Sequence, residues 1–139
     1  MRISIINGPN LNLTGTREPS VYGTESFDRL LADLSRVFPG HEFTYFQSNI
    51  EGEIIDKLQD HGFSTDGIIL NAGGYTHTSV AIGDTIKAIR TEVVEVHMSN
   101  ISAREEFRHT SFITPHAKGI ISGFGMQGYF LAARALLGI

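Results

Sequence analysis

The chain has 139 residues, which gives room for one domain with a hydrophobic core and is too short for two. It contains no cysteine, which excludes disulfides, thiolate catalysis and zinc–thiolate sites, and its net charge of -4 without a basic cluster argues against nucleic-acid binding. No apolar run approaches the ~20 residues that cross a bilayer, and the N-terminus lacks a signal-peptide pattern. We therefore expect a cytoplasmic protein that forms a single domain over residues 1–139 and has no membrane partner.

Hydrophobic periodicity predicts strands and helices that alternate along the chain. In order, we expect a strand at about 2–7, a helix at 26–38, a strand at 42–47, a helix at 51–61, a strand at 67–71, a helix at 78–90, a strand at 93–97, a strand at 119–122 and a helix at 127–137. The segment 99–116 looks irregular, with a short helix at 103–107. The first helix places five apolar residues on one face: Phe27, Leu30, Leu31, Leu34 and Val37.

Five strands that alternate with helices predict an α/β fold with one parallel sheet and helices on both faces. The flavodoxin-like strand order 2-1-3-4-5 is the simplest arrangement with right-handed crossovers. This order places the carboxyl ends of the first, third and fourth strands side by side. We expect the functional site there, because these three strands run into the polar stretches 7–10, 71–74 and 97–100.

A long loop, about residues 8–24, joins the first strand to the first helix. Its prolines and glycines prevent regular structure, and connections this long in compact domains are usually lids, binding loops or disorder. Apolar residues such as Leu11 and Leu13 give the loop something to bury, which argues against disorder. We therefore expect an active-site lid that carries Arg17 and Tyr22 over a pocket.

The stretch 71–79, N-A-G-G-Y-T-H-T-S, leaves a buried strand and enters a helix. Its glycines allow the backbone to approach a ligand closely, and Thr78 or Ser79 suits a helix N-cap. His77 faces the same crevice, although a histidine in such a place more often has a structural role than a functional one. From this stretch alone, a structural role for His77 is therefore favoured.

The fourth strand ends in E-V-H-M-S-N, in which His97 suits a general acid or base. Glu95 lies two residues earlier on the same strand face, where it can accept a ring N–H and fix the tautomer. The backbone N–H groups of Met98 and Ser99 offer an anion site just past the strand end. Arg104 and Arg108 share a face if their segment is helical, and they would otherwise form a solvated surface pair.

Three other patterns in the sequence do not indicate the functions they are usually linked to. Gly123 to Gly128 matches a dinucleotide fingerprint, but too few residues follow it for another strand with an acidic residue, so we expect tight strand-to-helix packing instead. A response regulator would have acidic residues where this chain has Asn7 and Asn71. None of the six histidines has the spacing of a metal motif, so no metal is expected.

Four motifs occur in order: N-G-P-N-L-N-L-T-G-T-R-E-P-S-V-Y-G from Asn7, N-A-G-G-Y-T-H-T-S from Asn71, E-V-H-M-S-N-I-S-A-R-E-E-F-R from Glu95, and a glycine-rich run that ends in Tyr129. Together they resemble the type II 3-dehydroquinate dehydratases, and the match extends from about residue 5 to 136. The resemblance implies a lyase of the shikimate pathway that dehydrates 3-dehydroquinate to 3-dehydroshikimate by anti elimination. It implies neither a metal nor a Schiff base, and no cofactor.

The resemblance also assigns catalytic roles. Tyr22 matches the general base, which removes a proton from the carbon next to the ketone, and Arg17 matches the cation that favours its phenolate. Asn10 matches the residue that holds a water at the enolate oxygen. His97 matches the general acid that protonates the departing hydroxyl, and Glu95 supports it.

The remaining family positions bind substrate. Asn71 and the backbone of Met98 and Ser99 would hold the carboxylate, whereas the ring hydroxyls would contact His77, Asp84 and Arg108. The family is a dodecamer built from trimers, in which the Asp84 position reaches a neighbour's site. Two positions depart from the family pattern: Ser102, commonly His, which could loosen the carboxylate side, and Gly83, often Arg, which puts the subunit contact near Asp84 in doubt.

Two alternatives remain open from the residues alone. A flavodoxin-like binding module could grip an anion at the same strand ends without turnover, although it would have no need of Tyr22, Arg17 and His97 together. The other class of dehydratase forms a Schiff base with lysine in a barrel of about 250 residues. This chain is too short for that barrel, and we expect its three lysines, Lys57, Lys87 and Lys118, to lie away from the crevice.

Overall fold

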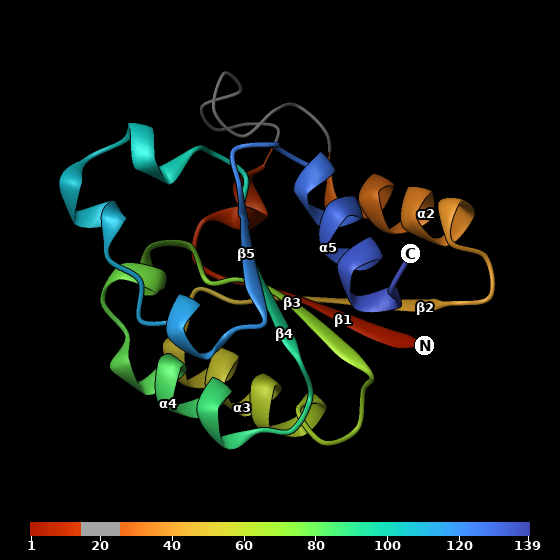
Figure 1. Ribbon diagram of the computed structural model, residues 1–139, viewed down its shortest axis with the longest axis horizontal. Helices are drawn as coiled ribbons and strands as arrows, with labels where there is room; N and C mark the ends of the chain where they lie inside the picture. Colours follow the sequence, from red (N-terminus) through yellow and green to blue (C-terminus); the bar gives the residue numbers. More distant parts are fainter. Residues whose placement is uncertain (15–25) are drawn as a thin grey trace.

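The computed structural model describes residues 1–14 and 26–139. Five parallel strands form one sheet of order β2-β1-β3-β4-β5, which confirms the predicted flavodoxin-like topology (Figure 1). The strands are β1 Arg2–Asn7, β2 Glu42–Gln47, β3 Gly67–Asn71, β4 Val93–His97 and β5 Gly119–Ser122. Each coincides with a predicted strand, because each is a short apolar or alternating run with turn residues at its ends.

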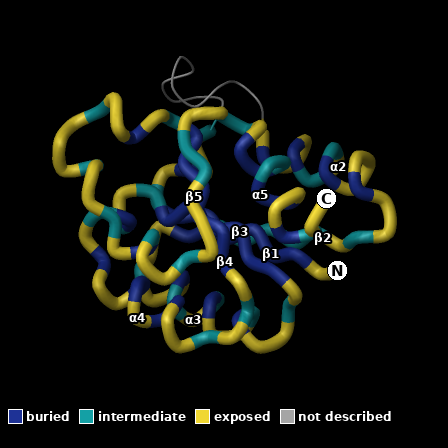
Figure 2. The backbone as a smooth tube through the Cα atoms, viewed as in Figure 1, coloured by how far each residue is buried: buried dark blue, intermediate teal, exposed yellow. Residues whose placement is uncertain are grey.

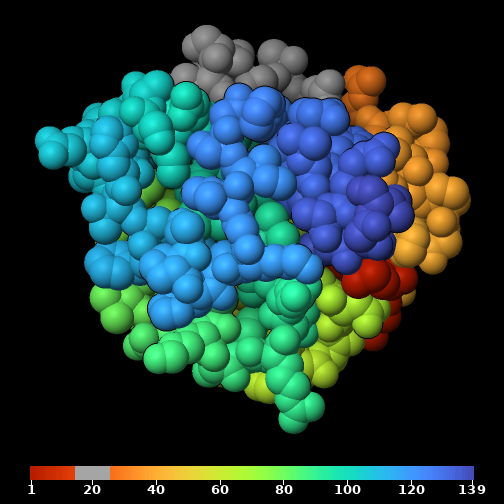
Figure 3. Space-filling model, in the orientation of Figure 1, coloured from red at the N-terminus to blue at the C-terminus, as the bar shows by residue number. Residues whose placement is uncertain are grey.

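Two helices cover each face of the sheet (Figure 1). The helices are α2 Phe27–Val37, α3 Glu51–His61, α4 Val80–Ala88 and α5 Gln127–Leu137. Helices α2 and α5 pack on one face, and α3 and α4 pack on the other. The three inner strands are therefore buried from both sides, as Figure 2 shows for the centre of the sheet. Segments from the second half of the chain cover most of the face seen in Figure 3.

The core consists of two apolar clusters, one on each side of the sheet. Leu30 and Leu34 of α2 pack with Tyr129 of α5 in the first cluster. Ile54 of α3 and Ile82 of α4 belong to the second. Each helix thus contributes an apolar stripe to the sheet, which is the arrangement that its 3.6-residue periodicity predicts.

The first and third predicted helices need correction. Val37 was expected on the buried face of the first helix, but it is 39% exposed because the helix ends there. The third was expected at 78–90, but α4 begins at Val80 and ends at Ala88. The Ser79 hydroxyl, one of the two predicted N-caps, accepts the N–H of Ile82 at 3.0 Å, so α4 begins two residues later than expected, after the 3-10 segment η2, Gly73–His77.

The predicted short helix at 103–107 is also wrong. Two 3-10 segments occupy this region, η3 Ile101–Ala103 and η4 Glu106–His109, and Thr114–His116 forms a further one, η5. Arg104 adopts extended backbone angles between the first two, with φ -107° and ψ -165°. The side chain of Asn100 accepts the N–H of Ser102 at 3.2 Å, and this local hydrogen bond competes with a continuous helix.

The glycine-rich run 123–128 joins β5 tightly to α5. The N–H of Gly125 donates to the carbonyl of Met98 at 2.9 Å, with the glycine at a φ of +57°. A Cβ on Gly128 would lie 3.2 Å from the Val96 side chain. This run therefore serves strand-to-helix packing, as predicted: the positive φ of Gly125 favours glycine, and a side chain at Gly128 would crowd Val96.

No helix in the described ranges is long and apolar enough to cross a membrane. Most of the predicted lid loop, including Arg17 and Tyr22, lies in residues 15–25, outside the described part of the chain. Its first residues are described, and Leu11–Leu13 form the short 3-10 segment η1.

Candidate active site

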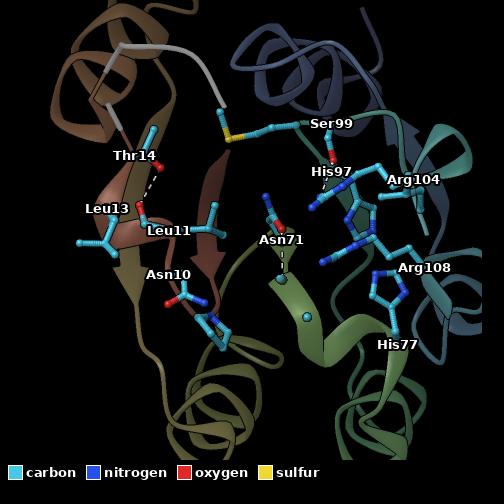
Figure 4. A pocket seen from close by; sticks show the side chains of 15 residues that line it. Asn10, Leu11, Leu13, Thr14, Asn71, His77, His97, Ser99, Arg104 and Arg108 are labelled. Carbon is cyan, nitrogen blue, oxygen red and sulfur yellow. Dashed lines mark hydrogen bonds between the residues drawn. The ribbon is translucent and has the colours of Figure 1, made fainter. Parts of the chain in front are cut away.

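A cavity opens at the carboxyl ends of β1, β3 and β4 (Figure 4). Three segments line it, and each follows one of these strands: 9–14, 71–77 and 97–108. In Figure 4, Asn10 and Leu11 lie on one side, His97 and Arg108 lie on the other, and Asn71 lies between them. The cavity is therefore located where the predicted strand order brings the polar strand ends together.

His97 and Glu95 form a buried pair at the end of β4. The Nε2 atom of His97 lies 2.6 Å from Oε2 of Glu95, and the two side chains are 6% and 0% exposed. They meet because residues two apart on a strand share a face. With Nε2 bound to the carboxylate, Nδ1 is the ring nitrogen that remains for a ligand in the cavity.

Two hydroxyl groups from the segment before β5 also donate to the Glu95 carboxylate. The hydroxyl of Thr114 donates to Oε1 at 2.5 Å, and that of Ser111 lies 3.3 Å from both oxygens. The Ser111 oxygen already accepts the backbone N–H groups of Ile113 and Thr114 at 3.0 Å, so its own proton is directed to Glu95. The carboxylate is thus an acceptor from three sides, which makes Nε2 of His97 the donor in the pair.

His77 has a defined tautomer. Its Nδ1 lies 2.7 Å from the carbonyl oxygen of Thr110, which can only accept, so Nδ1 carries the proton and Nε2 is an acceptor. Burial lowers the pKa of His77 below its usual value, and the nearby His97 and Arg108 act in the same direction, whereas the Thr110 hydrogen bond opposes them. The ring of His77 stacks near that of His97, with centroids 6.1 Å apart. The cavity therefore presents a neutral imidazole acceptor beside the buried His97–Glu95 pair.

Asn71 is held by two hydrogen bonds at the base of the cavity. Its Oδ1 accepts the N–H of Gly73 at 3.2 Å, and its Nδ2 donates to the hydroxyl of Tyr129 at 3.1 Å. That hydroxyl in turn donates to Oδ1 of Asn7 at 2.9 Å. Because the backbone N–H of Gly73 can only donate, it fixes which end of the Asn71 amide faces Tyr129.

Two arginines give the cavity a positive wall. Arg104 and Arg108 both line it, with side chains only 22% and 21% exposed, and so they are not a solvated surface pair. One guanidinium N–H of Arg104 donates to the Ser99 hydroxyl at 3.1 Å, and Nε of Arg108 donates to Glu105 at 2.6 Å. Their positive charges suit an anionic ligand.

Other predicted site residues are distributed as follows. Asn10, Met98 and Ser99 line the cavity. Asp84 lies on the exposed side of α4 and is not among the described residues that line the cavity of its own chain. The Ser102 position is likewise exposed. Arg17 and Tyr22 lie outside the described residues, although the cavity is bordered by Thr14, the last described residue before them.

Sequence reasoning did not assign every lining residue to the site. Arg104 was noted only as a partner of Arg108, four positions away, and that spacing was the available signal. The apolar residues Leu11, Leu13 and Ile101 also line the cavity, and apolar residues in irregular segments gave no signal of their own. Within residues 1–14 and 26–139, no group of three or more histidine and acidic side chains is placed to hold a metal ion.

The family model described as Dehydroquinase class II matches residues 1–137. A 3-dehydroquinate dehydratase of Exiguobacterium sp. is 54% identical over 138 residues, which cover 99% of this chain and 94% of the relative. A 3-dehydroquinate dehydratase of Caldicellulosiruptor bescii is 52% identical, and the match covers 97% of this chain and 95% of the relative.

Solved structures give the same result. The type II dehydroquinase from Butyrivibrio crossotus has a TM-score of 0.93 and 44% identity, with 99% of this chain and 97% of that chain covered. The type II dehydroquinase from Propionibacterium acnes has a TM-score of 0.92 and 35% identity, with the same coverage of 99% and 97%. The agreement spans the whole domain, including all three segments that line the cavity.

Proposed function

The chain belongs to the class II dehydroquinase family, whose reaction is the dehydration of 3-dehydroquinate in the shikimate pathway, and we propose that it catalyses this reaction by anti elimination through an enolate. The substrate is a small carboxylate with ring hydroxyls and a ketone. Removal of a proton next to the ketone and loss of a hydroxyl as water give the conjugated enone 3-dehydroshikimate.

The substrate carboxylate binds at the base of the cavity. The free N–H of the Asn71 amide and the backbone of Met98 and Ser99 face it, and the positive charge of Arg104 lies nearby. Charge-assisted hydrogen bonds of this kind are stronger than neutral ones, so the carboxylate orients the ring. Asn71 contributes a fixed donor because Gly73 and Tyr129 hold its amide.

The ring hydroxyls bind to His77 and Arg108. His77 accepts through Nε2, since Nδ1 is bound to Thr110, and the guanidinium of Arg108 donates. Asp84 of a neighbouring subunit completes this side, in a cytoplasmic dodecamer built from trimers. This assignment explains why Asp84 is exposed on α4 and away from the cavity of its own chain.

Tyr22 starts the reaction as the general base. A free phenol has a pKa near ~10 and is a poor base at neutral pH. A neighbouring cation favours the phenolate, and Arg17 has this role in the proposal. Family resemblance supports both assignments, in a loop of about residues 8–24 that covers the cavity as a lid.

The enolate that results places negative charge on the former ketone oxygen. A water held by Asn10 donates to it, from the wall of the cavity opposite His97 (Figure 4). His97, with a proton on each ring nitrogen, then gives the one on Nδ1 to the departing hydroxyl, while Nε2 stays bound to Glu95. The enolate electrons form the new carbon–carbon double bond as water leaves, and transfer of one proton through solvent from Tyr22 to His97 restores both residues for the next cycle.

The buried Glu95–His97 pair at the cavity is the observation that carries this proposal. Its test is the absorbance of the conjugated enone when 3-dehydroquinate is mixed with wild-type protein or with Tyr22→Phe. We expect rapid turnover by the wild type and a loss of about 100-fold or more in the variant. Turnover in both would retain the reaction and reject Tyr22 as the base, whereas no turnover by folded wild type would favour a binding module.

A further inference from the structure

Asn10 has an unusual backbone conformation. Its φ of 69° and ψ of -4° lie in the left-handed region, and it is the one non-glycine residue with a positive φ among those that the structure describes. This region is sparsely populated by residues with a side chain, and such conformations persist where the surroundings hold them. The conformation bears on function because it sets the direction in which the Asn10 side chain leaves the turn after β1.

The side chain of Asn49 holds this turn. Its Oδ1 accepts the backbone N–H of Asn10 at 3.0 Å and the Nε2 of Gln47 at 3.1 Å. Gln47 also donates to the carbonyl of Gly8 at 3.1 Å. A backbone N–H only donates and a carbonyl only accepts, so the orientations of both amides are fixed by the main chain.

The backbone of Asn49 makes a second connection to the site. Its carbonyl accepts the hydroxyl of Tyr75 at 3.0 Å, and Tyr75 belongs to η2, the segment that ends in His77. Asn49 follows β2, the edge strand next to β1, and is not among the described residues that line the cavity. It therefore bridges two of the segments that line the cavity without being placed to contact a ligand there.

We propose that Asn49 is a positioning residue for the active site, because its Oδ1 holds Asn10 in the left-handed conformation that directs the Asn10 side chain to the cavity. The consequence for turnover rests on the proposed function, in which Asn10 holds the water at the enolate oxygen. Without this acceptor, the Asn10 N–H turns to solvent and its backbone relaxes toward negative φ. The side chain then moves from its place opposite His97, and stabilisation of the enolate weakens.

Two substitutions at this position separate the acceptor from the rest of the side chain. Asn49→Ala removes Oδ1, whereas Asn49→Asp keeps an oxygen that can accept from both Asn10 and Gln47. We expect kcat to fall by about 10- to 100-fold in N49A, as for a small misplacement of a catalytic group, and to stay within about threefold of wild type in N49D. The comparison uses kcat because the added charge in N49D can raise KM for an anionic substrate.

Asp66→Ala is the matched control. Asp66 also accepts a backbone N–H with its side chain, that of Arg2 at 2.6 Å, but at the opposite end of β1 from the cavity. This variant should lose stability to a similar extent as N49A and keep the kcat of wild type. A kcat loss in D66A equal to that in N49A would show that the effect is general destabilisation and would overturn the proposal.

Hydrogen–deuterium exchange gives a readout that does not depend on turnover. The amide of Asn10, followed in a peptide spanning residues 8–14, should exchange faster in N49A than in wild type and at the wild-type rate in N49D. Unchanged exchange in N49A, or N49D as impaired as N49A, would refute the role of Oδ1. If wild type does not dehydrate 3-dehydroquinate, the proposed function fails, and the exchange experiment still tests whether Asn49 holds Asn10.

Discussion

At the scale of single residues, the site is defined by hydrogen bonds to groups that can only donate or can only accept. The carbonyl of Thr110 fixes the proton on Nδ1 of His77, and the N–H of Gly73 fixes the amide of Asn71. Glu95 receives three donors and so fixes Nε2 of His97 as a donor. Preorganised donors and acceptors of this kind need no reorganisation when charge develops in a reaction.

His77 should therefore bind substrate in its neutral form over a wide pH range. Its pKa is lowered from the ordinary histidine value, mainly by burial, so the ring protonates at a lower pH than a free imidazole does. Protonation removes the Nε2 acceptor, so substrate affinity is lost below the lowered pKa and not above it. His77→Gln should raise KM by about 3- to 10-fold, which corresponds to ~0.5–1.5 kcal/mol for one hydrogen bond.

The measurement is KM against pH for wild type and His77→Gln. The KM of His77→Gln divided by that of wild type should fall toward one as the pH is lowered, with a midpoint below ~6.5, the ordinary pKa of histidine. A midpoint at or above that value would contradict a lowered pKa for His77.

The hydroxyl of Thr114 should affect both stability and turnover, because the Glu95 carboxylate to which it donates is completely buried. Thr114→Val removes the hydroxyl that donates to Oε1 and leaves a buried acceptor short of one donor, which costs about 1–3 kcal/mol in the free energy of unfolding. We expect kcat also to fall, by about tenfold, because Glu95 then holds His97 less firmly.

Urea unfolding and steady-state kinetics check this expectation, with Thr85→Val as the control. The hydroxyl of Thr85 donates to a carbonyl within its own helix, that of Ala81 at 2.9 Å, so its loss leaves no buried charge short of a donor. Equal loss of kcat in the two variants would contradict the role given to Thr114.

At the scale of elements, close approach between α4 and the segment before β5 supports this arrangement. A Cβ on Gly83 would lie 2.3 Å from the carbonyl oxygen of Phe112, which is closer than side chains tolerate. The same segment carries Ser111 and Thr114 to Glu95. Gly83, one of the two departures from the family pattern, thus lies where this chain has no room for a side chain.

A pair of glycine-to-alanine substitutions tests this packing. Gly83→Ala should destabilise the fold by about 1–3 kcal/mol through overpacking and lower kcat by displacing the donors to Glu95. Gly52→Ala, in α3 where a Cβ meets nothing within 4 Å, should stabilise it by about 0.5–1 kcal/mol. Urea denaturation of both variants provides the measurement, and a G83A protein as stable as wild type would show that the segment moves aside at little cost.

The elements that the sequence predicted well are those decided by apolar periodicity. All five strands and the helices α3 and α5 have the expected bounds. The inner strands are continuous apolar runs because they are buried on both faces, and turn residues mark the ends of the other elements. The cap at Ser79 agrees with the sequence, although α4 is two residues shorter at each end than expected. The larger error falls where a short-range hydrogen bond sets the backbone, because Asn100 helps to divide the expected helix at 103–107 into two 3-10 segments.

At the scale of the whole molecule, the strand order gathers residues far apart in the chain at one edge of the sheet. This explains why the polar stretches 7–10, 71–74 and 97–100 were predictable as the site, since each lies at the end of a strand whose neighbours follow from the strand order. The place of Arg108 in the site came instead from the family resemblance. The role inferred for Asn49 was not predictable, because it depends on one hydrogen bond, from the backbone N–H of Asn10 after β1 to the side chain of Asn49 after β2. Periodicity carries no information about such a contact.

The three lysine side chains lie away from the cavity. Lys57 lies over the ring of Phe46, Lys118 pairs with Glu92 at 2.7 Å, and neither these nor Lys87 line the cavity. Since these are all the lysines of the chain, we expect borohydride in the presence of 3-dehydroquinate to leave activity unchanged. Irreversible inactivation with a label on lysine would contradict the mechanism.

In the proposed mechanism, proton abstraction and loss of hydroxyl are separate steps, with Tyr22 serving the first and His97 the second. The most direct test is deuterium incorporation from heavy water into unreacted 3-dehydroquinate, at the carbon that loses its proton, with His97→Gln, Tyr22→Phe and no enzyme. We expect His97→Gln to exchange this position well above background while forming little product, and Tyr22→Phe to show neither exchange nor product. Exchange by Tyr22→Phe, or none by a folded His97→Gln variant that binds substrate, would contradict this mechanism.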